Sequence, residues 1–182
     1  MATNNINLTY DDIRKYSNTI IRQMKKQNWT PSVVVGLTRG GLLPGVLISH
    51  QLNIPMCSLD VSFRDNIDTP FTGQTSTWIP EEIENGHNVL VVDDINDTGK
   101  TFEWIRDDWM NTVSFIDMKK RNGDNWPWNK IKFAAIIHNE PSSTSTDFFG
   151  KKINKNKDPS WIVFPWEKSK KRSRQTKHDR VQ

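Results

Sequence analysis

Cysteine is nearly absent from this chain of 182 residues, which contains Cys57 alone. One cysteine can form neither an intramolecular disulfide nor a cysteine-rich zinc site, so both kinds of stapled small domain are excluded. A chain of this length can instead bury enough apolar surface to fold around its own core. We therefore expect a cytoplasmic protein, because unpaired thiols are usual in that reducing compartment.

Long apolar runs are also missing. No stretch approaches the roughly 18 consecutive apolar residues of a membrane-spanning helix. Residues 1–7 are polar and lack the charged start and apolar segment of a secretion signal. The mean hydropathy of −0.69 agrees with both observations. We expect no association with a membrane.

Positive charge is concentrated at the C-terminus. Residues 168–182 hold seven of the 25 lysines and arginines but one of the 21 acidic residues, so they carry +6 and the rest of the chain −2. The net charge of +4 is thus a property of this tail. Like charges with few apolar residues cannot offset the entropy of ordering. We predict one domain over residues 1–167 and a solvated, disordered extension over 168–182.

The apolar pattern predicts alternating helices and strands. Thr9 and Asp12 form a capping signal in front of an amphipathic helix. A continuous apolar run such as Val89–Val92 is typical of a strand buried on both faces of a parallel sheet. The alternation favours an α/β fold with an open, mainly parallel sheet. Further helices are expected at Leu42–Leu52 and Thr101–Met110, further strands at Val33–Val35, Val113–Met118 and Phe133–Ile137, and another apolar stretch at Ile54–Val61.

Three polar segments interrupt this pattern. Residues 62–86 are too long for a plain connection, so we interpret them as a mobile functional loop that closes over a site. Residues 119–130 have the composition of a surface insertion, and residues 142–158 are rich in lysine, asparagine and serine.

The segment Val89–Thr101 (VLVVDDINDTGKT) carries the most chemical information. A buried strand ends in two acids, and a hydroxyl-rich loop then leads into a helix. In an open α/β sheet, ligands bind beyond the carboxyl ends of the strands. Backbone amides at residues 98–101 and the positive end of the helix are suited to a phosphate. Asp93 and Asp94 repel phosphate, so we expect them to bind sugar hydroxyls or help to hold Mg²⁺.

Gly99-Lys100-Thr101 also suggests the P-loop of nucleoside triphosphatases. That motif needs a glycine five positions before Gly99, because the backbone there approaches the phosphates closely. Asp94 occupies this position and would direct its charge at the β-phosphate. We therefore reject the P-loop interpretation.

The thirteen residues together resemble the phosphoribosyl diphosphate (PRPP) binding motif of type I phosphoribosyltransferases. The resemblance implies that Asp93 and Asp94 hold the ribose hydroxyls and that Asp97 lies beneath the ribose and base. It also implies that the 5′-phosphate is bound by Thr98, Gly99, Lys100 and Thr101. Asn96 departs from the family, which more often has an aliphatic residue there, and we expect this change to affect packing more than chemistry.

A second glycine-rich loop follows the strand at Val33. Its glycines allow the backbone to approach an anion, and Arg39 supplies a charge-assisted contact. Turn formation alone would also explain Gly40-Gly41. By resemblance, the loop with Thr38, Arg39 and Gly40 binds the diphosphate leaving group.

A third segment, Trp161–Glu167 (WIVFPWE), resembles the base-binding segment of bacterial and archaeal 6-oxopurine (xanthine, guanine, hypoxanthine) phosphoribosyltransferases. The resemblance implies that Trp161 stacks on the purine and that the carbonyl of Ile162 meets the base edge. It also implies a small hood that includes residues 159–167. A buried core strand is the alternative, and it suits Phe164 and Trp166 better, because stacking needs an open ring face.

The residue before Pro141 differs from this family. The 6-oxopurine enzymes usually have a lysine there, which donates to the 6-oxo group, whereas this chain has Glu140, which can only accept when ionised. We expect Glu140 at the base edge to weaken the use of hypoxanthine, unless another donor replaces the lysine. The replacement donors considered are His138, Lys151 and Lys152.

These features predict a type I phosphoribosyltransferase that joins PRPP to a purine-like base and releases diphosphate. We assign catalysis to Arg39, Asp93, Asp94 and Asp97, with Mg²⁺ as cofactor, held by Asp93 and Asp94 directly or through water. The resemblance also implies a homo-oligomer, a dimer or tetramer. Two alternatives stay open, because a fold does not fix a function: a non-catalytic PRPP-binding regulator that binds nucleic acid through its tail, and a structural protein with an inactive site.

Overall fold

The computed structural model describes residues 4–61, 79, 82–83, 85–117 and 128–167, but of residues 110–117 and 128 it describes the backbone alone. Five parallel strands form the central sheet in the order β3-β2-β4-β5-β6. Their bounds are β2 Val33–Leu37, β3 Met56–Leu59, β4 Val89–Asn96, β5 Ile131–Asn139 and β6 Phe148–Ile153. The expected mainly parallel α/β fold is therefore confirmed.

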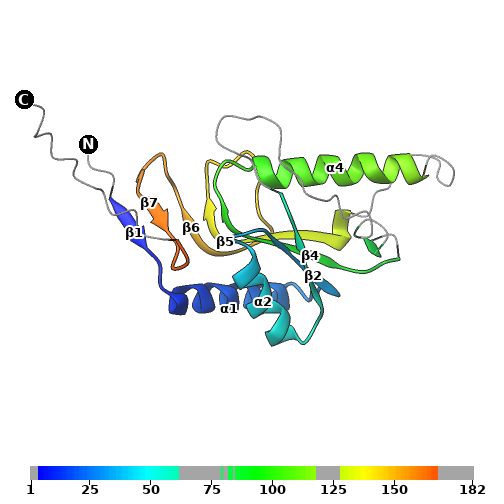
Figure 1. Cartoon of the computed structure of the whole chain (residues 1–182), viewed down its shortest axis with the longest axis horizontal. Helices are drawn as coiled ribbons and strands as arrows, with labels where there is room; N and C mark the ends of the chain where they lie inside the picture. The colour runs from blue at the N-terminus through cyan, green and yellow to red at the C-terminus, as the bar shows by residue number, and fades with distance from the viewer. Residues whose placement is uncertain (1–3, 62–78, 80–81, 84, 118–127, 168–182) are drawn as a thin grey trace, which may run out of the picture.

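Helices cover both faces of this sheet. Helices α1 (Tyr10–Lys26) and α2 (Leu42–Leu52) lie on one face and α4 (Lys100–Asp117) on the other (Figure 1). Strand β4 divides its apolar run between them: Leu90 and Val92 join the core beneath α1 and α2, whereas Val89 and Val91 join the core beneath α4. Burial on both faces explains why the strand is continuously apolar.

Helix α1 begins where the capping signal predicts. The Thr9 side chain accepts a hydrogen bond from the Asp12 amide, and the Asp12 carboxylate accepts one from the Thr9 amide. Its buried residues recur at helical spacing and face the sheet: Ile13, Ser17, Ile20, Ile21 and Met24. This helix thus connects the central sheet to the terminal segment that precedes it.

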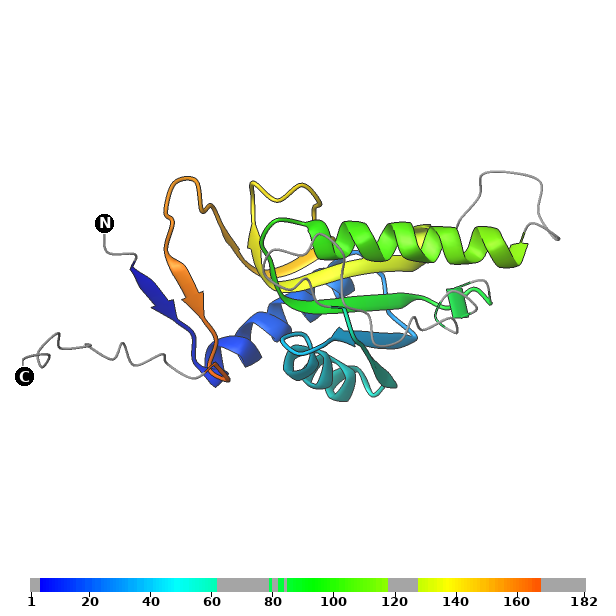
Figure 2. The same ribbon diagram turned by 45° about the horizontal axis from the view of Figure 1, so that its top comes forward.

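A second, smaller sheet joins the two ends of the domain. Strand β1 (Asn5–Asn7) pairs in parallel with β7 (Trp161–Val163), and the Leu8 amide extends the pairing to the Val163 carbonyl. Figures 1 and 2 both show this pair beside the central sheet rather than within it. It lies where the hood is expected.

Two expectations about the second half of the chain are wrong. Val113–Met118 was expected to form a strand, but residues up to Asp117 continue α4, because neither glycine nor proline interrupts the helix after Thr101. The polar segment 142–158 contains β6, whose partner is the buried strand β5.

Other expectations fall outside the described residues. These are residues 62–78 of the functional loop, residues 119–127 of the insertion and the whole tail 168–182. The end of the insertion, Trp128–Lys130, forms a single 3₁₀ turn. Within the part of the chain that is described, no helix is both long and apolar enough to span a membrane.

Candidate functional site

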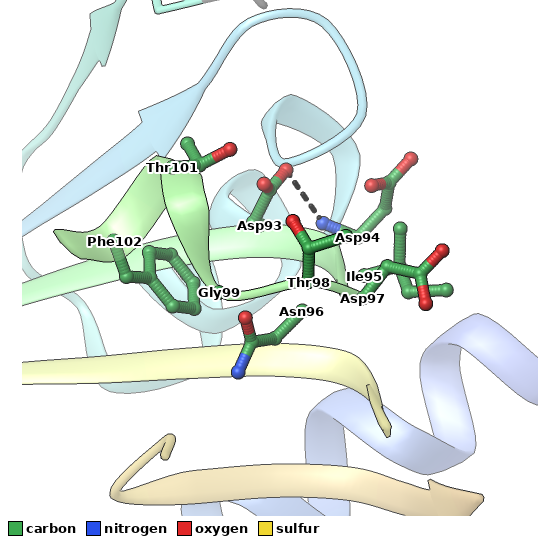
Figure 3. Close-up of a pocket in the computed structure, with 9 residues that line it drawn as sticks. All are labelled: Asp93, Asp94, Ile95, Asn96, Asp97, Thr98, Gly99, Thr101 and Phe102. Atoms are coloured by element: carbon green, nitrogen blue, oxygen red, sulfur yellow. Dashed lines mark hydrogen bonds between the residues drawn. The ribbon is translucent and has the colours of Figure 1, made fainter. Parts of the chain in front are cut away.

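A pocket opens at the carboxyl end of β4, at the turn into α4. It is lined by Asp93, Asp94, Ile95, Asn96, Asp97, Thr98, Gly99, Thr101 and Phe102. Figure 3 shows the Asp93 and Thr101 side chains on one side of this loop, and Asn96 on the other, over β5. The structure thus gathers Asp93, Asp94 and the predicted phosphate loop, residues 98–101, in one place.

Asp93 and Asp94 are adjacent acids in a poorly solvated position. Burial, followed by the neighbouring charge of Asp94, raises the pKa of Asp93 well above its ordinary value. Burial is also the main cause for Asp94, whose pKa rises to about 6, with repulsion from Glu167 adding to the effect. Among the described residues, no lysine or arginine forms an ion pair with either carboxylate. The pair is therefore suited to a cationic or hydroxyl-bearing ligand.

The phosphate loop is packed against the segment that connects β5 to β6. The Ser143 amide and hydroxyl both donate to the Thr98 carbonyl at 2.9 Å. Gly99 has φ +94°, and a Cβ atom there would lie 2.5 Å from the Thr144 amide nitrogen. Glycine is needed here for both its conformation and the close contact. The amides at the start of α4 stay the expected phosphate donors.

Asn96, the departure from the family motif, has a structural partner. It is buried, and its amide nitrogen donates to the Thr144 carbonyl at 2.6 Å and lies 3.2 Å from His138 Nδ1. His138 is its register partner on β5 and stacks on Phe149. The contacts show that Asn96 secures the β5–β6 connection behind the phosphate loop, in line with the expected effect on packing.

The loop between β2 and α2 lies directly beside the acids. A Cβ atom on Gly40 would lie 1.9 Å from an Asp94 carboxylate oxygen, so only glycine fits there unless Asp94 moves. The Thr38 hydroxyl donates to Asp60 at 2.7 Å, which ties the loop to the end of β3. The Thr38–Arg39 peptide bond is cis, and Arg39 is exposed. The expected diphosphate loop therefore borders the expected ribose site, with Arg39 accessible to an anion.

The predicted base-binding residues differ in exposure. Trp161 is 59% exposed, whereas Ile162 is 5% exposed and packs in the core. Phe164 and Trp166 stack on each other with ring centres 5.0 Å apart. An open ring face is what stacking on a base requires, and of these three aromatic residues Trp161 exposes the most surface.

Asp97 lies in a network that the sequence did not reveal. Its carboxylate accepts from the Lys155 ammonium group at 2.5 Å and from the Asn139 amide at 3.1 Å. The Lys155 Nζ also lies 5.5 Å from the centre of the Trp161 ring. Lys155 and Asn139 thus connect the residue expected beneath the base to the ring expected to stack on it.

Glu140 makes different contacts. Its carboxylate accepts from the Asn154 amide at 3.1 Å and lies 3.7 Å from Lys152 Nζ, and these contacts lower its pKa. The base-edge role of Glu140 stays a prediction that these contacts do not support.

The residues present fit a magnesium ion that shares its ligands with a substrate. Asp93 and Asp94 lie side by side in the pocket, whereas its third acid, Asp97, pairs with Lys155. The described residues contain no group of three or more potential metal ligands. Mg²⁺ is usually held by one or two carboxylates, with phosphate oxygens and water as its other ligands. The two acids can therefore supply the protein's share of such a site.

The chain resembles known proteins over nearly its whole length. Residues 3–170 match the family described as the phosphoribosyl transferase domain. The chain belongs to this family. Its match over most of the length supports the interpretation of the strand–loop–helix motif at Val89–Thr101.

Individual relatives add detail. The chain is 25% identical over 171 residues to a xanthine-guanine phosphoribosyltransferase of Cereibacter sphaeroides, covering 88% of this chain and 85% of that protein. It is 27% identical over 135 residues to the enzyme of the same name from Idiomarina loihiensis, covering 74% and 70%. A crystal structure of purine phosphoribosyltransferase from Pyrococcus horikoshii superposes with a TM-score of 0.65 at 25% identity, covering 91% of this chain and 95% of that one.

The packing around Gly99 predicts a cost in stability as well as in affinity. From the motif alone, Gly99→Val is expected to act mainly on PRPP binding, but any Cβ also displaces residues 142–144. Gly99→Ala should lower the free energy of unfolding by at least about 2 kcal/mol, from a strained φ plus the lost contact. Gly86→Ala is the matched control, because Gly86 has φ +84° with open space around it. Gly86→Ala should lower the free energy of unfolding by about 1 kcal/mol in denaturant titrations. Equal losses in Gly86→Ala and Gly99→Ala would contradict the packing argument.

The raised pKa of Asp94 predicts that this acid destabilises the free protein at neutral pH. The folded state binds more protons between the ordinary value of 3.8 and about 6, so stability falls as pH rises through that window. Asp94→Asn should raise the free energy of unfolding at pH 7.5 by about 1–2 kcal/mol. This value is smaller than the pKa shift alone implies, because Asp94 is partly exposed and water screens its charge. The gain should disappear below the ordinary pKa.

The same substitution should lower transferase turnover at least about tenfold, because it removes a charge placed for a cationic ribose. Asp93→Asn should behave alike. Asp11→Asn, on the exposed first turn of α1, serves as the control. It should leave turnover unchanged and lower stability by less than about 1 kcal/mol, because its ion pair with Arg14 is exposed. Thermal melts across pH and steady-state kinetics would measure both effects, and a destabilised variant with full turnover would contradict the assignment.

Proposed function

We propose that this protein transfers the 5-phosphoribosyl group of PRPP to a purine base, releasing diphosphate and forming a nucleoside 5′-monophosphate. One observation carries the proposal. The acids Asp93 and Asp94, the phosphate loop at residues 98–101 and the Arg39 loop meet at the carboxyl ends of adjacent parallel strands. Relatives named as xanthine-guanine phosphoribosyltransferases support a purine as the acceptor.

The bond changes define what the site must do. The bond between the ribose C1 atom and diphosphate breaks, a bond from C1 to a base nitrogen forms, and that nitrogen loses its proton. Positive charge develops on the ribose as diphosphate leaves, so positioned negative charge lowers the barrier. Asp93 and Asp94 are placed to bind the ribose hydroxyls and to stabilise this charge. Once the two acids are ionised, their burial strengthens the effect, because water screens their charges less.

The remaining residues hold the two ends of the substrate. The amides at residues 98–101 and the start of α4 bind the 5′-phosphate, and Thr38, Arg39 and Gly40 border the leaving diphosphate. Mg²⁺, when bound, neutralises charge on the leaving group. Trp161 offers an open face for the purine, and Asp97 lies beside it. Fixing both ends aligns the reacting atoms, which is a large part of catalysis in such a transfer.

Other parts of the prediction extend this proposal. A reaction on PRPP and a nucleobase suits a cytoplasmic enzyme, and a homo-oligomer remains an expectation from the family. No feature of the described residues favours a non-catalytic regulator. The tail's binding to nucleic acid rests on charge alone.

The proposal predicts diphosphate release that depends on both PRPP and a purine. A panel of adenine, hypoxanthine, guanine and xanthine, each with Mg²⁺, should give at least one base with turnover above the rate of PRPP hydrolysis. Thr101→Ala should raise the KM for PRPP at least about fivefold with a smaller change in kcat, because it removes a phosphate donor.

Thr19→Ala is the matched control, since Thr19 lies on α1 and its hydroxyl bonds the Lys15 carbonyl. It should leave both constants unchanged. If PRPP binds but no purine is used, the acceptor class is wrong. If PRPP does not bind at all, the whole assignment fails.

A further inference from the structure

Lys155 is a cationic side chain that contacts both Asp97 and Trp161, the residues expected at the base site. Its Nζ lies 2.5 Å from Asp97 and 5.5 Å from the centre of the exposed Trp161 ring. Its side chain is 21% exposed, so it is half-buried against these neighbours. The ammonium group lies over one face of the Trp161 ring. A base that stacks on this face displaces it toward the edge of the base by rotation of the lysine side chain.

The backbone fixes this lysine in place. The Lys155 amide donates to the Asn139 side-chain oxygen at 3.0 Å, and the Asn139 amide group donates to Asp97 at 3.1 Å. Asn139 thus links the end of β5, the loop after β4 and the segment after β6. The backbone of Lys155 is thus held in place, so only its side chain has to rotate when a base binds.

The other donors suggested by the sequence are occupied elsewhere. His138 is buried and lies against Asn96 and Phe149. Lys152 pairs with Glu140 and lies over the Phe149 ring. Lys151 is an exposed residue of β6. None of the three has a contact to Asp97 or Trp161 among the interactions of the described residues.

We infer that Lys155 is the specificity-determining donor to the 6-oxo group of a purine. It takes the role of the lysine that the 6-oxopurine enzymes usually have before the proline, where this chain has Glu140. The inference rests on the proposed function and deepens it. An ammonium group has three N–H donors. Asp97 uses one, and a 6-oxo oxygen can accept another. Sites built to donate to a substrate oxygen discriminate strongly against analogues that lack it. The acceptor class is therefore a 6-oxopurine, and the weak use of hypoxanthine expected from Glu140 is reversed.

A purely structural role for the Lys155–Asp97 ion pair makes a different prediction. Loss of the pair would then disturb Asp97 and weaken every nucleotide alike. A donor to the 6-oxo group acts only on nucleotides that carry this group. The two roles are separated by comparing a nucleotide that has the 6-oxo group and the N1 proton that accompanies it with a nucleotide that has neither.

The test measures binding of inosine 5′-monophosphate and of purine riboside 5′-monophosphate, which lacks the 6-oxo group, by isothermal titration calorimetry. The full-length protein should bind the first at least about tenfold more tightly. Lys155→Met should reduce this preference to about twofold or less, mainly by weakening inosine 5′-monophosphate. Lys157→Met, an exposed lysine in the same segment, should keep the full preference.

The contrary outcomes are distinct. Equal weakening of both nucleotides, an unchanged preference in Lys155→Met or no preference in the unmodified protein would each overturn the role of Lys155 while leaving the proposed function standing. Failure of the unmodified protein to bind either nucleotide would overturn the proposed function and this inference together. Circular dichroism of Lys155→Met verifies that the fold is retained.

Discussion

Two carboxylates side by side at the end of a buried strand are the constraint around which the site is built. Asp93 and Asp94 both have a raised pKa, because burial and neighbouring negative charge disfavour their ionised forms. The surrounding fold must supply the stability that this pair removes. The sheet does so by burying β4 on both faces, between α1 and α2 on one side and α4 on the other. Acids whose ionised forms are destabilised, held in a rigid frame, are typical of a functional site.

The pocket is formed with the help of three connections, β2–α2, β4–α4 and β5–β6, which are held by close contacts. Gly40 lies against Asp94, Gly99 lies against residues 142–144, and Asn96 bonds the same connection from beneath. These contacts leave no space for a side chain at either glycine. The polar groups that face the pocket are thus fixed before a ligand arrives, which reduces the entropy lost on binding.

The sequence predicted the strands β2, β4 and β5 and the gathering of Asp93, Asp94 and residues 98–101 at the end of β4, because local patterns specify both. It did not predict β6. The run Val89–Val92 followed by Asp93 marks a buried strand and its functional end. The contacts of Asn96 and Lys155 could not be predicted in this way, since their partners are 42 and 58 residues away in the chain. The strand expected at Val113–Met118 is wrong for a different reason. A short apolar run with β-branched and aromatic residues also fits a helix that packs on a sheet, so the local pattern does not distinguish the two.

The most direct test is a crystal structure of the protein with inosine 5′-monophosphate. The account predicts the phosphate on the amides of residues 98–101, the ribose hydroxyls beside Asp93 and Asp94, and the purine on Trp161 with its 6-oxo group at Lys155. A nucleotide bound outside this pocket, or one whose phosphate lies away from the start of α4, would contradict it.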